Sequence, residues 1–245
     1  MRQWSALFIK DFKLTRSMFF IGIVMNVLIA MLTLFLERAA DDSLLMFVPL
    51  AIAAAIHVIY VPLFVFVGLK SEGNLHLWLS NPQPAVKLLL SKVANSLLMV
   101  VISLVLLYGF SRLLIVPKFN LIEPYWTDTW KVGWFIFPNV IWISIELSAW
   151  VMVLWALYQY LKLKIGRWSW AAVAGAAILS GSLNALIKSS ALYRYVMNWG
   201  SIAYPFPTIL SKPIQTYVGG YVYDLIMIVG LFILTAWLVD NKVEG

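Results

Sequence analysis

Six apolar runs, each about 19 to 30 residues long, occupy most of this chain. An α-helix needs about 20 mainly apolar residues to cross the hydrocarbon core of a bilayer. The composition agrees, because 62% of the 245 residues are hydrophobic and only 12% are charged, far from the balance of a soluble domain. We therefore predict an all-α, polytopic membrane protein with six transmembrane helices at residues 18–36, 44–69, 93–116, 132–161, 168–187 and 218–239.

The polar segments between these runs are too short to fold separately, so residues 1–245 are interpreted as one transmembrane domain. The chain has no cysteine, which excludes disulfides and thiolate metal sites. Its net charge of +7 is typical of basic cytoplasmic loops next to anionic lipid headgroups, and we do not interpret it as a sign of nucleic-acid binding.

The distribution of basic residues predicts the orientation in the membrane. If the N-terminus is inside, the inner segments hold eleven Lys and Arg residues and the outer loops hold seven. Because cytoplasmic loops carry the excess of Lys and Arg, we expect a multi-pass protein of the cell membrane with both termini in the cytoplasm.

The segment Met1–Ser17 is predicted to be an amphipathic helix. Trp4, Phe8 and Phe12 lie on its apolar arc and most of its basic residues lie opposite, although Asp11 interrupts the apolar arc. A basic, aromatic helix of this kind lies in the headgroup plane. It would serve either as a lipid anchor or as a partner-binding element, and the pattern does not separate the two.

The polar stretch Lys70–Lys92 separates the second and third apolar runs. Ser71 is suited to cap a short helix that begins at Glu72, with the carboxylate at the positive end of the helix dipole. Pro82 should end that helix and Pro84 should open the next one. The short helix would carry on one side Leu75, Trp78 and Leu79.

A second long connection, Lys188–Tyr217, is rich in aromatic residues and contains three prolines. We predict a broken helical hairpin that dips into the outer leaflet between the fifth and sixth spans. Irregular backbone at that depth needs protein or water around it.

Catalytic and metal-binding motifs are missing from the sequence. It contains neither a Walker loop nor an H-E-x-x-H motif, and its two histidines cannot form a histidine-rich metal site. We therefore predict no catalytic, cofactor-binding or metal-binding residues. One weak pattern, Ser180-Gly181-Ser182 together with His57, resembles the serine and histidine of a membrane serine protease.

Two ionisable residues, His57 and Glu146, lie near the middle of predicted spans. A charged side chain at a helix centre costs about 2.5–3.5 kcal/mol on insertion scales, so both should face other helices or water. They would pair with each other, line a substrate path or relay a proton.

The whole pattern resembles the permease subunits of type-2 ABC exporters, which have an N-terminal amphipathic helix, six spans and a short helix between spans two and three. That family has a Glu-Gly opening, leucines, a proline and then a lysine before span three. The residues in those places here are Glu72, Gly73, Leu75, Leu77, Leu79, Pro82 and Lys92. The bulky run His76-Leu77-Trp78 departs from the family pattern and leaves the identity of the partner open.

The resemblance implies a transport subunit that is not itself an enzyme. Separate ATPase subunits would carry the ATP and Mg, and a second permease, identical or related, would complete the substrate path. The coupling helix would contact the ATPase through Glu72, Gly73, Leu75, Trp78, Leu79 and Pro82. The connecting helix beside it would carry Trp4, Phe8 and Phe12. An amphipathic peptide, an antibiotic or a lipid-like molecule would suit the apolar, aromatic outer elements.

Three other functions stay open at the level of the sequence. A proton-coupled secondary transporter would use His57 and Glu146. A membrane enzyme would use Ser182 with His57. A structural or immunity subunit would share the fold without transporting anything, because fold does not fix function.

Overall fold

The computed structural model describes residues 2–39, 47–74, 83–115, 119–205 and 212–243. These residues are mostly helical, and one small β-hairpin interrupts the helices. The elements in chain order are α1 (Arg2–Ala39), α2 (Phe47–His57), α3 (Tyr60–Asn74), α4 (Ala85–Ile115), α5 (Phe119–Ile165), η3 (Gly166–Trp168), α6 (Ser169–Ser189), α7 (Ala191–Met197), β1 (Ser201–Tyr204), β2 (Ile214–Tyr217), α8 (Val218–Leu238) and η4 (Val239–Val243).

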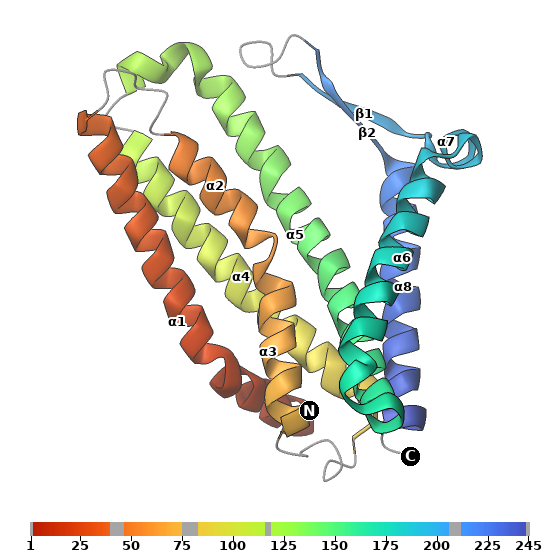
Figure 1. Ribbon diagram of the computed structural model, residues 1–245. Helices are drawn as coiled ribbons and strands as arrows, with labels where there is room; N and C mark the ends of the chain where they lie inside the picture. The colour runs from red at the N-terminus through yellow and green to blue at the C-terminus, as the bar shows by residue number, and fades with distance from the viewer. Residues whose placement is uncertain (1, 40–46, 75–82, 116–118, 206–211, 244–245) are drawn as a thin grey trace.

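The long helices lie alongside one another, with both chain ends at one end of the molecule and the β-hairpin at the other (Figure 1). In the described part of the chain, four helical segments are long and apolar enough to cross a membrane, or five if the bent pair α2–α3 is one span. The prediction of a helical membrane protein is therefore confirmed. The six-span arrangement stays a prediction, because α5 and α6 count here as one segment, Gly133–Ser189.

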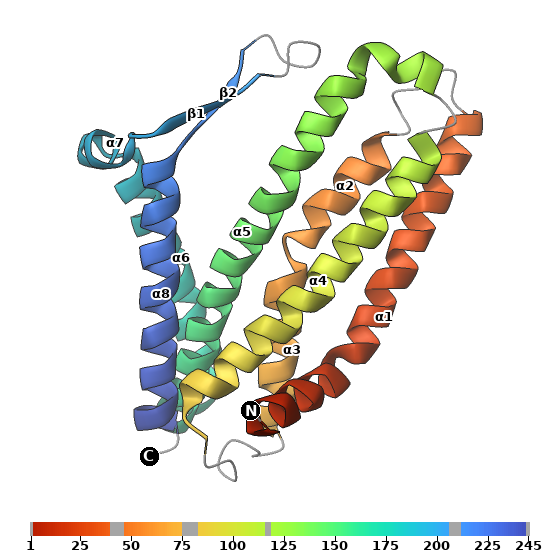
Figure 2. The same ribbon diagram turned by 180° about the vertical axis from the view of Figure 1, so that it is seen from behind.

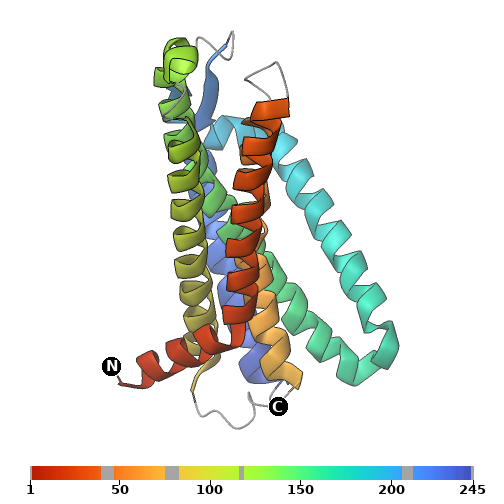
Figure 3. The ribbon, with the colours of Figure 1, turned by 90° about the vertical axis from the view of Figure 1, so that its left-hand side faces the viewer.

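The N-terminal amphipathic segment and the first apolar run form one continuous helix, α1, rather than two. The first turns of α1 bend away from the axis of the rest (Figure 3). Its buried positions include Asp11, Thr15, Phe19, Gly22 and Asn26, which recur three or four residues apart. This spacing places them on one face of the helix, and that face packs against α4.

The second apolar run is broken into α2 and α3, which meet at an angle of 41°. Pro62 explains the break, because it lacks the N–H that would bond to the carbonyl of Val58 and its ring crowds that carbonyl. The amides of Val58 and Ile59 instead bond three residues back, to the carbonyls of Ala55 and Ile56. The second apolar run is therefore not one straight helix, and the prediction that it crosses the membrane as a single span stays a prediction.

The helix α4 begins directly after Pro84, whose carbonyl accepts bonds from the amides of Lys87 and Leu88. Proline is well tolerated just at the start of a helix, so the prediction that Pro84 opens a helix is confirmed. By contrast, the residues between the predicted spans 93–116 and 132–161 are helical from Phe119 onward. The helix α5 already begins at Phe119 and continues through Lys131 to Ile165.

The connection after α6 contains the short helix α7 and an antiparallel hairpin of β1 and β2, in which Ser201 is opposite Tyr217 and Tyr204 opposite Ile214. This connection therefore differs from the helical hairpin that we predicted, whereas the prediction of a predominantly helical fold is confirmed. Pro205 follows β1 and Pro213 precedes β2, and a proline cannot donate to the strand ladder.

The buried core lies where α1, α3, α4, α5 and α8 pack together. Fully buried side chains such as Val61, Val65 and Leu69 of α3 meet Leu89 and Met99 of α4 in this core. Seen from behind, α6 and α8 stand beside α5 on the side away from α1 (Figure 2). The helix α6 packs mainly on α5 and α7, so it lies at the edge of the bundle.

Candidate functional site

Four charged side chains from three helices meet near the end of the molecule that holds the two termini, and we call them the buried ion cluster. They are Lys10 and Asp11 of α1, Glu72 of α3 and Lys92 of α4. The Nζ atom of Lys92 lies 2.8 Å from Oδ1 of Asp11 and 2.7 Å from Oε2 of Glu72. Lys10 forms an ion pair with the other carboxylate oxygen of Glu72. The cluster thus joins the amphipathic start of α1 to α3 and α4.

The charges of this cluster balance, with two cations against two carboxylates. Asp11, Glu72 and Lys92 are each no more than 3% exposed, whereas the side chain of Lys10 is 35% exposed. A buried ion pair adds little net stability, but loss of one partner leaves an uncompensated buried charge and is strongly destabilising. The cluster therefore acts as a specific joint between the three helices rather than as a general source of stability.

Neighbouring polar groups complete the environment of Asp11. The hydroxyl of Ser91 donates to its Oδ2 at 2.6 Å, and the hydroxyl of Thr15 donates to its main-chain carbonyl at 3.0 Å. The side-chain amide of Asn95 in turn donates to Thr15 at 3.1 Å. A line of polar contacts thus runs along the interface between α1 and α4.

The long side chain of Lys92 passes close to Gly68 of α3. A Cβ atom at Gly68 would lie 3.7 Å from Cδ of Lys92, so the stem of the lysine passes over the glycine. Gly68 and Glu72 are four residues apart and share one face of α3. The stem of Lys92 therefore lies along the same face of α3 that supplies the carboxylate for its ammonium group.

The structure brings together two residues of the sequence motif, Glu72 and Lys92. Ser71 does not cap a helix that begins at Glu72, because α3 runs through both residues to Asn74. Gly73 also belongs to α3, and Glu72 faces into the bundle rather than outward. The remaining predicted coupling residues lie outside the described residues: Leu75, Trp78, Leu79 and Pro82.

The aromatic residues of the predicted connecting helix face largely outward. Trp4 is 38% exposed and Phe12 is 36% exposed, while Phe8 is half-buried. The sequence interpretation missed Lys10 and treated Asp11 as an irregularity of the apolar arc. The presence of a carboxylate among apolar residues was the signal that could have identified it as a buried partner.

His57 belongs to a separate hydrogen-bonded group at the break between α2 and α3. Its Nε2 lies 2.9 Å from the hydroxyl of Ser103, and its Nδ1 lies 2.7 Å from the carbonyl of Ala53. The amide of Asn26 donates to the same hydroxyl at 2.9 Å and to the Ser103 carbonyl at 3.1 Å. Because the Ala53 carbonyl only accepts, His57 carries its proton on Nδ1 and accepts from Ser103, which is a complete set of bonds for a neutral imidazole.

Glu146, in the interior of α5, lies in a different environment. Its electrostatic neighbours are Asp224 of α8 and Lys188 of α6. Both ring nitrogens of His57 are already bonded elsewhere, so His57 and Glu146 do not form a pair. Ser182 is exposed on α6 while His57 is buried between α2 and α4, so the structure does not assemble the suggested serine–histidine site either.

Within the ranges that the structure describes, no three His, Asp or Glu side chains are grouped to hold a metal ion.

No protein-family model matches the chain, and no solved structure matches it. The uncharacterized protein YhcE of Bacillus subtilis (strain 168) is 28% identical over 254 aligned positions, which cover the full length of both proteins.

Proposed function

We propose that this chain is the membrane-spanning permease subunit of a type-2 ABC exporter in the cell membrane. The supporting observation is the buried ion cluster. It fixes the amphipathic start of α1 to the end of α3, where the chain enters the segment that resembles a coupling helix.

In this proposal the segment 72–82 receives the movement of a separate ATPase subunit that binds ATP and Mg. Glu72 does not contact the ATPase but joins the segment to the bundle through Lys92 and Lys10. Leu75, Trp78 and Leu79, the apolar residues of the predicted coupling helix, would contact the ATPase instead.

The ion cluster gives this movement a defined route into the membrane domain. Because a buried charge is costly to separate from its partner, displacement of the end of α3 moves α1 and α4 with it. With six spans and both termini in the cytoplasm, a second permease, identical or related, completes the substrate path. The cargo would be an amphipathic peptide, an antibiotic or a lipid-like molecule.

The proposal is tested by co-purification from the native membrane. The tagged chain is solubilised gently, and the co-purifying proteins are identified and quantified. We expect a stoichiometric ATPase with a Walker loop, and we expect Leu75→Asp to lose it while the chain still inserts. Lys87→Met serves as the control. Because Lys87 is exposed on α4, this variant should still co-purify with the ATPase.

Two results would overturn the proposal. One is a pure preparation of the wild-type chain without any ATPase. The other is a Leu75→Asp variant that retains the ATPase in full amount and with full hydrolysis, which would exclude the coupling segment as the contact.

A further inference from the structure

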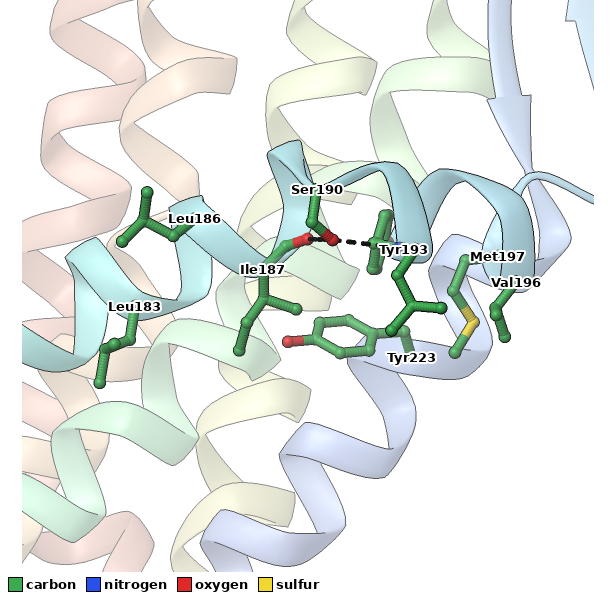
Figure 4. A pocket seen from close by; sticks show the side chains of 9 residues that line it. Leu183, Leu186, Ile187, Ser190, Tyr193, Val196, Met197 and Tyr223 are labelled. Carbon is green, nitrogen blue, oxygen red and sulfur yellow. Dashed lines mark hydrogen bonds between the residues drawn. The ribbon is translucent and has the colours of Figure 1, made fainter.

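An apolar groove of about 470 Å³ lies between the end of α6, the short helix α7 and the start of α8 (Figure 4). Leu186 and Ile187 of α6 line one wall, and Val196 and Met197 of α7 line another. The serine that caps α7, Ser190, accepts from the amide of Tyr193 at 3.1 Å and donates to the carbonyl of Ile187 at 2.8 Å. These bonds fix the position of α7 at the end of α6, so that α7 forms a defined wall of the groove.

An ammonium group already occupies a defined position next to this groove. The Nζ atom of Lys188 lies 2.8 Å from Oδ1 of Asp224 and 5.7 Å from the centre of the Tyr223 ring. Tyr223 also lines the groove, and its ring meets that of Tyr193 edge to face at 5.1 Å. A hydrogen bond of 3.0 Å to Asn184 holds the Tyr223 hydroxyl. The carboxylate and the aromatic ring therefore form a site for a cation.

The charges around this site favour a cation over an anion. Asp224 pairs directly with the Lys188 ammonium, and the carboxyl group of Glu146 lies within electrostatic range of both. Arg194 on α7 is a further cation, but it is exposed. The side chain of Lys188 is itself 36% exposed and has a flexible four-carbon stem, so its ammonium has room to move away from Asp224.

We propose that this groove binds an amphipathic cation. The apolar part of the ligand fills the groove, and its cationic group takes the place of the Lys188 ammonium between Asp224 and the ring of Tyr223. Aromatic faces attract such cations, quaternary ammonium groups included. If the chain is an exporter, an amphipathic cation is the class of its cargo, and only this assignment of the cargo rests on the proposed function.

Lys188 makes the inference specific, because the lysine competes with the ligand for Asp224. Removal of the lysine should therefore strengthen binding, whereas removal of the carboxylate should weaken it. A neutral lipid chain would use only the apolar walls, and neither substitution would affect its binding.

The test measures saturable binding of tritiated dodecyltrimethylammonium to the full chain in phosphatidylcholine nanodiscs, after subtraction of empty nanodiscs. We expect Asp224→Asn to weaken binding by about tenfold or more, which corresponds to about 1.4 kcal/mol. We expect Lys188→Met to tighten binding severalfold. Lys162→Met is the matched control, because Lys162 is an exposed lysine of α5, and it should bind like the wild type.

The double variant with both Lys188→Met and Asp224→Asn separates a binding role from misfolding. It removes both charges of the Lys188–Asp224 ion pair together, so the fold should be intact while binding stays weak. Recovery of binding in the double variant would overturn the proposal. Equal competition by dodecanol together with unchanged binding in Asp224→Asn would also overturn it. No ATPase is needed, so failure here is distinct from failure of the co-purification.

Discussion

Substitution of Lys92 by methionine is the most direct test of the buried ion cluster. Methionine keeps much of the apolar stem but removes the ammonium that lies 2.8 Å from Asp11 and 2.7 Å from Glu72. Glu72 would keep Lys10, which is partly exposed, and Asp11 would keep only hydrogen bonds from neutral groups. Asp11 thereby becomes a buried carboxylate without a cation among the contacts described for it.

The expected loss of stability follows from this geometry. Removal of one partner of a buried ion pair costs about 3–5 kcal/mol. For a chain of this length, each kcal/mol lowers the Tm by about 2–4 °C, so Lys92→Met should melt about 6–20 °C below the wild type. The twelve tryptophans of the chain provide the signal for thermal unfolding by intrinsic fluorescence.

Two further variants make the measurement decisive. Lys87→Met removes an exposed lysine from the same helix, and surface substitutions usually change stability by about 0.5 kcal/mol or less. The double variant Asp11→Asn/Lys92→Met removes one charge of each sign and should regain most of the lost Tm. If Lys92→Met melts within about 2 °C of Lys87→Met, a shift that corresponds to about 1 kcal/mol or less, the cluster does not join the helices as we infer.

Two other substitutions test the upper part of the bundle. Ser103→Ala should lower the free energy of unfolding by about 1–3 kcal/mol, because Nε2 of His57 and the amide of Asn26 lose their shared hydroxyl partner. Thermal unfolding would be compared with Ser111→Ala, whose hydroxyl donates to the Leu107 carbonyl of its own helix. Equal Tm values for the two variants would contradict the prediction. Gly219→Ala should displace α7 from α8, because a Cβ there would lie 2.0 Å from the carbonyl oxygen of Met197. We expect proteases to cleave the connection 190–217 faster in this variant than in Gly220→Ala. Equal cleavage rates in the two variants would refute the prediction.

The helices that the sequence predicted best are those bounded by clear changes in polarity. The apolar runs at 168–187 and 218–239 differ from α6 and α8 by no more than two residues at either end. In both cases the hydrophobic pattern and the helix end at the same polar boundary. The helix start after Pro84 was predictable for a different reason, because proline both ends one segment and fits the first turn of the next.

Features that depend on partners distant in the sequence were not predictable. Asp11 looked like an error in an amphipathic pattern because its partner, Lys92, lies 81 residues away. Strands β1 and β2 have four residues each, too few for a periodic pattern, and the nearby prolines suggested broken helices instead. The break at Val58, however, has a local cause in Pro62 that the length of the apolar run concealed.

The position of α3 between two polar groups has a mechanical consequence. The group of Asn26, His57 and Ser103 lies at the break above it, and the ion cluster lies at its lower end. Both groups contact α1 and α4, so the broken helix α2–α3 is held to these two helices at His57 of α2 and at Glu72 of α3. A force on the end of α3 at Glu72 therefore either tilts α3 together with α1 and α4 or changes the angle between α2 and α3 near Pro62.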